Sequence, residues 1–372
     1  MAGLYLHIPF CKTRCIYCAF HSGTDLTAVA RYVSALCREL HERCHETDAP
    51  IATIYFGGGT PSLLETSYME TIFDQIETDF AVESNAEITL ECNPDDVTDQ
   101  RAAEWAKLPF NRISVGIQSF NDAELRFMRR RHTAVQAEKA VHTLQTAGFG
   151  NISIDLMFGL PMQTQASWLD TLHKSIALGV QHISAYSLTY EGNTTLVRLL
   201  REKKIEEIDE ELSLALFRNA VTELEQAGFE QYEISNFCQS GFHSRHNSAY
   251  WSGVPYLGIG AAAHSYNGNL RRWNVADTEK YIHGIEHGMP DFGYEELTCE
   301  DKYNEFVFTS LRTSKGIDLQ KLDDVMRTYC LRNAEKHINN GMLELRDGFL
   351  RLTRNGIFVS DGITSDLFHI EE

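Results

Sequence analysis

The sequence LYLHIPFCKTRCIYC, residues 4–18, leads from a short apolar run directly into three closely spaced cysteines, Cys11, Cys15 and Cys18. The apolar run over residues 4–8 predicts a strand, so the cysteines fall in the loop that follows it. Three thiolates can hold three corners of a [4Fe–4S] cluster, whereas a cluster that only transfers electrons normally takes four. The fourth iron then keeps an open position for a substrate, as the metal does in a catalytic zinc site.

The spacing of these cysteines leaves two other interpretations open. The first is a zinc site of three cysteines and one histidine, with His7 or His21 as the fourth ligand. The second is a chance grouping of thiols. The other six cysteines are scattered along the chain, and we interpret them as small buried apolar residues.

Beyond the cysteines, short apolar runs alternate with segments that carry apolar residues at helical spacing. The expected strands are 4–8, 51–56, 87–91, 113–117, 152–158 and 183–188, and the expected helices are 28–43, 65–79, 99–107, 134–146 and 167–178. This repeated alternation indicates βαβ crossovers and a parallel sheet, so the predicted fold class is α/β. The pattern alone does not choose between an incomplete barrel and a doubly wound sheet.

The alternation of strands and helices ends at about residue 190, and we expect three segments: 1–190, 191–294 and 295–372. The middle segment holds a long amphipathic helix over 208–227 and then a stretch rich in glycine and aromatic residues. The last segment follows a charged run at 295–301. Helices over 303–314 and 319–339 and short strands over 342–345, 349–352 and 357–359 predict a small α+β, winged-helix-like domain.

Composition and charge exclude several classes of protein. The formal net charge is −19, which disfavours binding to nucleic acid or to anionic membranes. No run of about 18 apolar residues is present, so we expect no membrane insertion. The first residues lack the basic and apolar parts of a secretory signal. Nine cysteines without such a signal indicate reduced thiols and a cytoplasmic location.

A second group of polar and glycine residues lies at the ends of the expected strands, where α/β folds place ligands. Consecutive glycines at Gly57-Gly58-Gly59-Thr60-Pro61 allow backbone groups to approach a polar ligand closely. The side chains that follow later strands are Glu91, Gln118, Arg130 and Asp155.

The cysteine spacing, followed by repeated βα units, resembles the radical S-adenosylmethionine (SAM) superfamily. That resemblance implies a partial (β/α)6 barrel, a [4Fe–4S] cluster held by Cys11, Cys15 and Cys18, and SAM chelated at the open iron. In this family an electron from the cluster cleaves SAM to a 5′-deoxyadenosyl radical. By position, the resemblance assigns SAM contacts to Tyr5, Tyr17, Gly59, Thr60, Pro61, Glu91, Gln118, Arg130 and Asp155. A register shift by one would replace Arg130 with Arg129 or Arg131.

Within the superfamily the chain resembles the branch of oxygen-independent coproporphyrinogen III oxidases. Enzymes of that branch carry a fourth cysteine two positions after the third, where this chain has Phe20. The segment 246–251, HNSAYW, instead resembles the haem-chaperone subfamily, HemW. That subfamily implies haem as a ligand, with His246 as the candidate axial ligand and Tyr250 and Trp251 packing on the ring. A carrier must release its haem, so we expect a site partly open to solvent, with His243 and His264 as competing ligands.

The leading functional prediction is therefore a haem chaperone that carries a cluster and SAM, delivers haem to acceptor haemoproteins and receives electrons from a reductant protein. Whether it is also an enzyme stays open, although coproporphyrinogen dehydrogenase activity is not expected. Oxygen-independent coproporphyrinogen III dehydrogenase is the main alternative. A radical SAM enzyme acting on tRNA and a zinc-binding regulatory module are further alternatives, and the charge disfavours the first of these.

Overall fold

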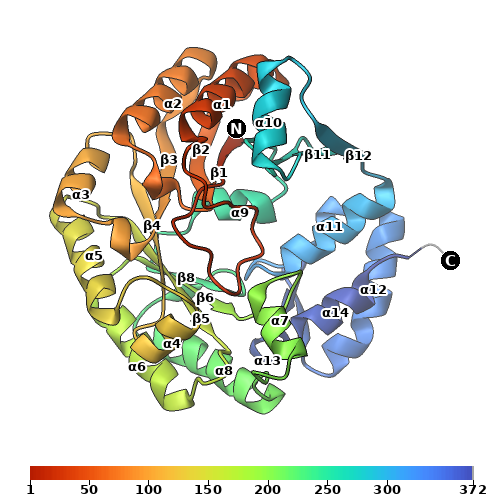
Figure 1. Cartoon of the computed structure of the whole chain (residues 1–372). Helices are drawn as coiled ribbons and strands as arrows, with labels where there is room; N and C mark the ends of the chain where they lie inside the picture. The colour runs from red at the N-terminus through yellow and green to blue at the C-terminus, as the bar shows by residue number, and fades with distance from the viewer. Residues whose placement is uncertain (371–372) are drawn as a thin grey trace.

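Six parallel strands in sequence order form one curved wall in the computed structural model, which describes residues 1–370 (Figure 1). These strands are β1 (Ala2–Ile8), β2 (Ile51–Gly58), β3 (Val82–Cys92), β4 (Arg112–Gln118), β5 (Ile152–Phe158) and β6 (His182–Ser187). A doubly wound sheet would reverse its strand order at a switch point, and this order does not reverse. The expected α/β class and partial (β/α)6 barrel are confirmed.

Helices between the strands cover the outer face of the wall (Figure 1). They are α1 (Val29–Arg43), α2 (Thr66–Asp79), α3 (Asp99–Trp105), α4 (Asp122–Phe127), α5 (Ala134–Thr146) and α6 (Gln165–Ala177), with the 3-10 turns η1 (Cys44–Glu46), η2 (Pro61–Leu63) and η3 (Pro94–Asp96). Side chains of a strand alternate between its two faces. In β1 the outward Leu4 and Leu6 are fully buried in the core with α1, so Tyr5 and His7 face the inside of the curve.

The segment after β6 lengthens the sheet at both ends, to twelve strands. Beside β6 lie β8 (Asn236–Cys238) and β7 (Glu230–Gln231), both antiparallel to their neighbours. Beside β1 lies β9 (Tyr256–Ile259), which is parallel to β1, and then β10 (His264–Tyr266), β11 (Leu270–Asn274) and β12 (Phe292–Glu296), which are antiparallel. The helices of this segment are α7 (Thr195–Arg201), α8 (Glu210–Gln226), α9 (Arg245–Trp251) and α10 (Thr278–Glu286).

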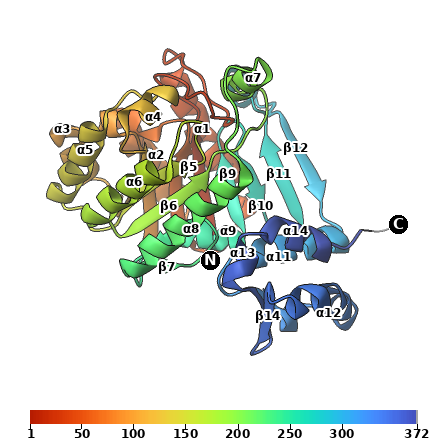
Figure 2. The same ribbon diagram turned by 90° about the horizontal axis from the view of Figure 1, so that it is seen from below.

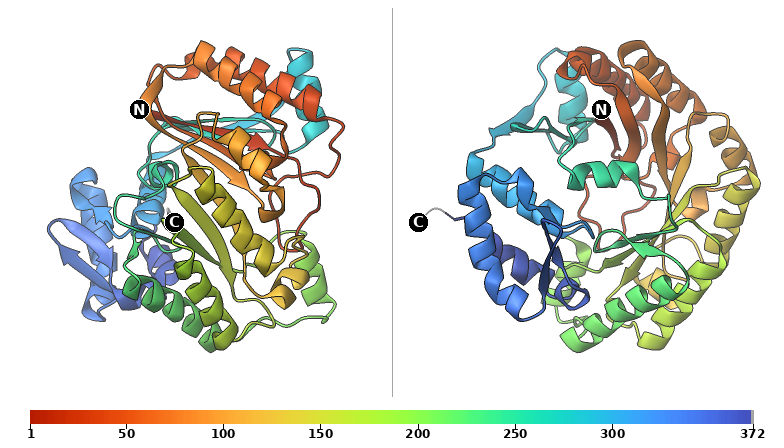
Figure 3. Two further views of the ribbon diagram at one scale, coloured as in Figure 1. Left: turned by 90° about the vertical axis from the view of Figure 1, so that its left-hand side faces the viewer. Right: turned by 180° about the vertical axis from the view of Figure 1, so that it is seen from behind.

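Helix α9 lies across the middle of the ring when the molecule is seen from behind (Figure 3). The Glu87 carboxylate of β3 holds its first turn, accepting hydrogen bonds from the backbone N–H groups of Arg245 and His246 at 2.9 Å each. A carboxylate at a helix N-terminus also interacts favourably with the helix dipole. The segment 246–251 is thereby fixed against the first halves of the strands, where Asn247 lines the same cavity as the cysteines.

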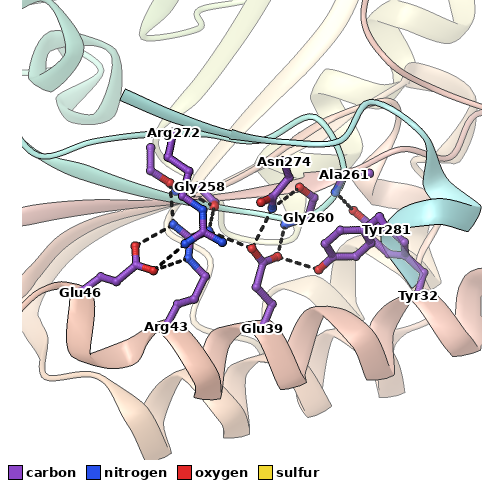
Figure 4. Close-up of polar contacts among 11 residues, drawn as sticks. Tyr32, Glu39, Arg43, Glu46, Gly258, Gly260, Ala261, Arg272, Asn274 and Tyr281 are labelled. Carbon is purple, nitrogen blue, oxygen red and sulfur yellow. Dashed lines mark hydrogen bonds and ion pairs between the residues drawn. The ribbon is translucent and has the colours of Figure 1, made fainter. Parts of the chain in front are cut away.

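A buried polar network attaches the added strands to α1 (Figure 4). The Glu39 carboxylate accepts four hydrogen bonds: from Arg43 at 2.8 Å, Asn274 at 2.7 Å, Tyr281 at 2.7 Å and the Gly260 N–H at 2.8 Å. Arg43 also donates to the Gly258 carbonyl at 2.9 Å. These bonds join α1, β11, α10 and the end of β9. They also compensate for the burial of the charges on Glu39 and Arg43.

The last part of the chain has its own apolar core and its own three-stranded antiparallel sheet (Figure 2). Its elements are α11 (Cys299–Leu311), β13 (Ile317–Asp318), η4 (Leu319–Lys321), α12 (Asp324–Asn339), β14 (Leu343–Arg346), β15 (Phe349–Leu352), α13 (Arg354–Ile357) and α14 (Ser360–Leu367). The strand predicted over 357–359 is wrong, because this segment joins two short helices. Thr353 caps the first of them by accepting from the Gly356 N–H at 3.1 Å. A short apolar run does not distinguish a strand from a buried helix.

Within residues 1–370, none of the helices combines the length and the apolar character needed to cross a membrane.

We predict that Glu39→Ala destabilises the fold strongly, because it leaves Arg43 and three other donors without their shared acceptor. Loss of one partner of a buried ion pair costs about 3–5 kcal/mol. The matched control is Glu42→Ala on the same helix, which breaks the exposed Arg38–Glu42 pair at 2.7 Å and should cost roughly 0.3–0.5 kcal/mol. Urea unfolding followed by circular dichroism measures both, and equal losses would contradict the role given to Glu39.

Candidate functional site

A cavity of about 540 Å³ opens at the carboxyl ends of the parallel strands, beneath the loop that carries the cysteines. This is the place where α/β folds bind ligands. The predicted site residues that line it are Cys11, Cys15, Tyr17, Cys18, Gly59, Thr60, Pro61, Glu91, Gln118, Arg130 and Asp155. The structure therefore brings together eleven side chains or backbone positions spread over residues 11–155. The two predicted residues that do not line the cavity are Tyr5 and His246.

The cysteine loop is closed at its base and anchored at its centre. The Cys11 N–H donates to the Gly23 carbonyl and the Gly23 N–H donates to the Pro9 carbonyl, both at 2.8 Å. Ile16, at the middle of the loop, is buried in an apolar cluster with Met128 and Leu196. Its carbonyl accepts from the Leu196 N–H at 2.9 Å. Apolar burial of Ile16 thus positions a loop that has no regular secondary structure.

A chain of hydrogen bonds crosses the cavity between two of the thiols. Arg130 donates to Cys15 Sγ at 3.3 Å and to Asn93 Oδ1 at 2.5 Å, and it also donates to the Gly116 carbonyl. Asn93 donates to Thr60 Oγ1 at 3.0 Å, and Thr60 donates to Cys11 Sγ at 3.4 Å. These hydrogen bonds hold the sulfurs of Cys11 and Cys15 in place on either side of the cavity.

Of the three consecutive arginines 129–131, only Arg130 lines the cavity, which Arg14 and Arg112 also line. Arg131 forms ion pairs with Asp95 and Asp96. Arg129 is exposed, with a left-handed φ of 59° in the turn after α4. The assignment of a SAM contact to Arg130 stays a prediction.

The three thiols fit a cluster better than a single zinc ion. Within residues 1–370, no three His, Cys, Asp or Glu side chains converge on the position of one metal ion. A cube of four irons does not need such convergence, because each thiolate binds a different iron. The histidines considered as a fourth zinc ligand also have other partners. His7 contacts the Tyr5 hydroxyl at 3.1 Å and the His21 carbonyl at 2.9 Å, and His21 Nε2 contacts Thr278 at 3.0 Å.

Glycines are required at the end of β2 because the backbone there passes very close to His7 and Phe10. Gly58 has a φ of 109°, and a Cβ at this position would lie 2.8 Å from the His7 ring. A Cβ on Gly59 would lie 2.8 Å from the Phe10 carbonyl oxygen. Any larger residue would push the backbone away from the cysteine loop, so these glycines bring strand end and loop together.

Two of the carboxyl groups that line this cavity, Glu91 and Asp155, have raised pKa values. Burial raises the pKa of Glu91 to about 7, and the nearby Asp155 carboxylate adds to the rise. The Tyr55 hydroxyl, which donates to Glu91 Oε1 at 2.7 Å, and the Gly58 N–H both act in the opposite direction. Burial also raises the pKa of Asp155, against hydrogen bonds from Ser184 and Ser114. A cationic ligand with hydroxyl or amino donors would find acceptors here.

Gln118 occupies a strained backbone position at the end of β4. Its φ is 73°, in the left-handed region that a residue with a side chain rarely adopts, and the pairing of β4 with β5 shifts by one residue there. Strain of this kind is concentrated at binding sites, where surrounding structure enforces it. A Cβ on Gly116 would lie 3.1 Å from Gln118 Nε2 and 3.3 Å from Arg130 Nη2, so the missing side chain makes room for both.

His246 does not have the geometry expected of a haem ligand. The residue is 2% exposed, and its ring nitrogens lie 2.8 Å from Thr53 Oγ1 and 2.9 Å from the Tyr250 hydroxyl. Its ring stacks on Tyr55, with ring centres 4.9 Å apart. The expected partly solvent-open setting therefore differs from the structure, in which this ring is buried and hydrogen-bonded, and the role of His246 as a haem ligand stays a prediction. The physical reason is that α9 packs against the inner face of β2.

Tyr5 lies beside this stack rather than in the cavity. Its ring centre is 6.1 Å from that of Tyr55 and 6.4 Å from that of His246. Sequence reasoning also missed Tyr55 and Asn93 as site residues. Asn93 stands directly after Glu91 and Cys92 at a strand end, which was a usable signal, whereas Tyr55 inside an apolar strand gave none.

Comparison with family models and known proteins gives the following similarities. The model of the radical SAM superfamily matches residues 5–174, and that of the HemN C-terminal domain matches residues 297–359. The chain is 32% identical over 371 residues to the heme chaperone HemW of Mycobacterium tuberculosis, covering 98% of this chain and 94% of that protein. It is 34% identical over 368 residues to the heme chaperone HemW of Bacillus subtilis, covering 96% of each.

Two further similarities extend beyond these bacterial relatives. The mitochondrial radical S-adenosyl methionine domain-containing protein 1 of Mus musculus is 34% identical over 387 residues, covering 97% of this chain and 86% of that protein. Among solved structures, the coproporphyrinogen III oxidase HemN of Escherichia coli, a radical SAM enzyme, matches with a TM-score of 0.85. That match covers 99% of this chain and 90% of the other at 21% identity, and it establishes the fold.

We predict that Glu91→Gln stabilises the ligand-free protein at pH 8. The pKa of Glu91 rises from 4.5 to about 7 on folding, so the folded state binds more protons than the unfolded state between these values. The contribution of Glu91 to the free energy of unfolding therefore falls as the pH increases from 4.5 to about 7. The glutamine variant should gain on the order of 1–3 kcal/mol at pH 8 and nothing at pH 4.5.

Thermal unfolding at several pH values measures this gain, with Glu335→Gln on the exposed face of α12 as the control. Identical pH profiles for wild type and Glu91→Gln would show that burial of this carboxyl does not destabilise the folded protein.

Proposed function

The chain belongs to the radical SAM superfamily and, within it, to the HemW family, and from this membership we propose that it is a haem chaperone. In this proposal it binds haem as cargo and delivers it to acceptor haemoproteins. The observation that carries the proposal is similarity over nearly the whole chain to relatives named heme chaperone HemW, at 32% and 34% identity. Partial matches confined to the barrel would not support it.

The proposal includes two resident cofactors, a [4Fe–4S] cluster and SAM. Cys11, Cys15 and Cys18 bind the cluster, and Arg130 and Thr60 stabilise two of the thiolates by donating to sulfur. When bound, the cluster supplies an electron and an iron with an open position for SAM. Tyr17 and Pro61 complete the cavity wall beside the cysteine loop.

The polar residues of the cavity have the chemistry that SAM requires. SAM carries a sulfonium and an amino group that are positive, and ribose hydroxyls that donate hydrogen bonds. Glu91 and Asp155 provide acceptors, and the approach of Gly58 and Gly59 leaves backbone groups free of side-chain cover. Gln118 provides an amide that can both donate and accept.

The proposed partners are haem, the acceptor haemoproteins and a reductant protein for the cluster. The net charge of −19 supports a function without nucleic acid. All nine cysteines are free thiols, which supports a reducing compartment such as the cytoplasm.

The second candidate function is oxygen-independent coproporphyrinogen III dehydrogenase, and the TM-score of 0.85 to the Escherichia coli enzyme favours it. The identity to that enzyme is only 21%. Phe20 stands where the enzymes of that branch carry a further cysteine, and its side chain is 69% exposed. We therefore place this function second.

We predict that protein reconstituted anaerobically holds about four irons and four sulfides per chain, as a single cube requires. Cys11→Ala, Cys15→Ala and Cys18→Ala should each abolish the cluster, because each removes one of its three protein ligands. Cys299→Ala is the matched control, since that thiol is exposed on α11. Iron and sulfide analysis with absorption spectroscopy measures the result, and stoichiometric zinc in place of iron would refute the cluster.

We further predict that the reconstituted protein binds about one haem per chain and transfers it to the apo form of a haemoprotein. The same preparation, given coproporphyrinogen III, SAM and a reductant, should form no protoporphyrinogen. Absorption spectra follow the transfer and chromatography follows the porphyrins. Conversion of coproporphyrinogen III without haem transfer would establish the second candidate instead.

A further inference from the structure

The cavity beneath the cysteine loop extends to the amino ends of the parallel strands. The residues that line this far end are Arg112 of β4, Ser153 of β5, His182 of β6 and Asn247 of α9, and together they are called the floor. Arg112 begins the strand that Gln118 ends, and six residues of a strand span roughly 20 Å. Helix α9 lies across the middle of the ring at this end (Figure 3). The floor is therefore distant from the carboxyl ends of the strands, where the cysteines lie.

Arg112 is a buried cation without hydrogen bonds. The residue is 2% exposed. A guanidinium has five N–H donors, and within residues 1–370 none of those of Arg112 finds an acceptor, Nε included. Its ion pair with Glu87 measures 3.9 Å from Nε to Oε2, which is too long for a hydrogen bond. Both oxygens of Glu87 already accept from the backbone of α9.

This arrangement contrasts with that of Arg43, which is 5% exposed. Arg43 donates to carboxylate, carbonyl and hydroxyl oxygens of four residues, as a buried charge requires. Next to Arg112, its cross-strand partner Thr89 is fully buried, and in the described part of the chain the Thr89 hydroxyl has no partner either. Two adjacent buried polar groups without partners indicate that a ligand supplies them.

The other groups of the floor restrict the chemistry of this ligand. The amide of Asn247 faces the cavity and has no hydrogen bond within residues 1–370, so it can donate to the same ligand. His182 is occupied on both ring nitrogens, by Ser153 at 2.7 Å and by Tyr232 at 2.8 Å. Burial and the cation of Arg112 lower the pKa of His182, so its ring is neutral.

The charges around the floor favour a ligand with one negative charge. A planar guanidinium matches the two oxygens of a carboxylate. The carboxylate of Glu87 lies 3.9 Å from Arg112, and Asp155 lines the same cavity. These acids would repel a dianion such as phosphate more strongly than a monoanion.

We propose that the floor binds the carboxylate of a second ligand beside SAM, held by the guanidinium of Arg112 and the amide of Asn247. The presence of SAM in the same cavity rests on the proposed function, whereas the anion site goes beyond it. The carboxylate belongs to a propionate of haem or to a free monocarboxylic acid. Two neighbours in the segment 246–251 then have different tasks, since His246 packs α9 against β2 and Asn247 contacts the ligand.

The test compares propionate with propionamide, its neutral analogue, on the cluster-loaded full chain with SAM. At constant ionic strength propionate should raise the melting temperature of wild type and propionamide should not, because a ligand of the folded state stabilises it. Arg112→Gln should weaken propionate binding at least tenfold, and Asn247→Ala should weaken it less. Arg126→Gln, which removes an exposed arginine of α4, is the matched control and should respond as wild type does.

The stability of the ligand-free variants gives a second readout. Arg112→Gln should keep the melting temperature of wild type, because no hydrogen bond is lost, whereas Arg43→Gln should lower it. Equal losses would show that Arg112 supports the fold instead of a ligand. Weaker SAM binding in Arg112→Gln would show that the carboxylate of SAM itself occupies the floor. Either result, or an equal response of wild type to propionate and propionamide, would overturn the proposal.

Titration with haem and with haem dimethyl ester, in which both propionates are blocked, identifies the source of the carboxylate. A preference of wild type for haem that Arg112→Gln removes would assign the floor to a propionate. Equal binding of haem and its ester would assign the floor to a free acid. Absence of haem binding in wild type would overturn the proposed function but not the anion site, which the propionate comparison tests independently.

Discussion

The guanidinium of Arg130 sets the geometry on which the candidate site depends, because it bonds to three separate segments at once. It contacts Cys15 in the cysteine loop, Asn93 after β3 and the Gly116 carbonyl in β4. A buried charge is tolerated only when its hydrogen-bonding groups find partners. The loop, the strand ends and the turn after α4 must therefore adopt one mutual arrangement. The absence of a side chain at Gly116 leaves the space that this guanidinium and the amide of Gln118 occupy.

Much of this architecture was predictable, because strongly periodic segments determine their own secondary structure. The six strands of the wall and the helix at 134–146 followed from apolar spacing, and the cavity residues followed from their places at strand ends. The signal failed where elements are short. Helix α4 has six residues, and β7 and β13 have two each, so none of them shows a period. Their formation depends on tertiary contacts, such as the pairing of β7 with β8.

The segment 246–251 shows the limit of reasoning from a motif to a ligand. Its sequence identified a conspicuous histidine among aromatic residues, but sequence does not say whether a ring nitrogen is free. In the structure, His246 packs on Tyr55, whose hydroxyl bonds Glu91. At the other end of the segment, Trp251 lies under the Arg312 guanidinium at 4.8 Å. The segment 246–251 therefore packs α9 against the parallel strands on one side and against the C-terminal part of the chain on the other.

The sheet does not close on itself: its order begins with β12 and ends with β7, and within residues 1–370 these two edges are not paired. A closed barrel admits a ligand only through its ends, along the axis. An open sheet instead has two edges, and the C-terminal part of the chain lies between them (Figure 1). Strand edges can pair with another chain, and here one edge is two residues long while the other ends in Glu295 and Glu296. Short edge strands and charged side chains are the usual protection of such edges, so the sheet can stay open without pairing with a second molecule.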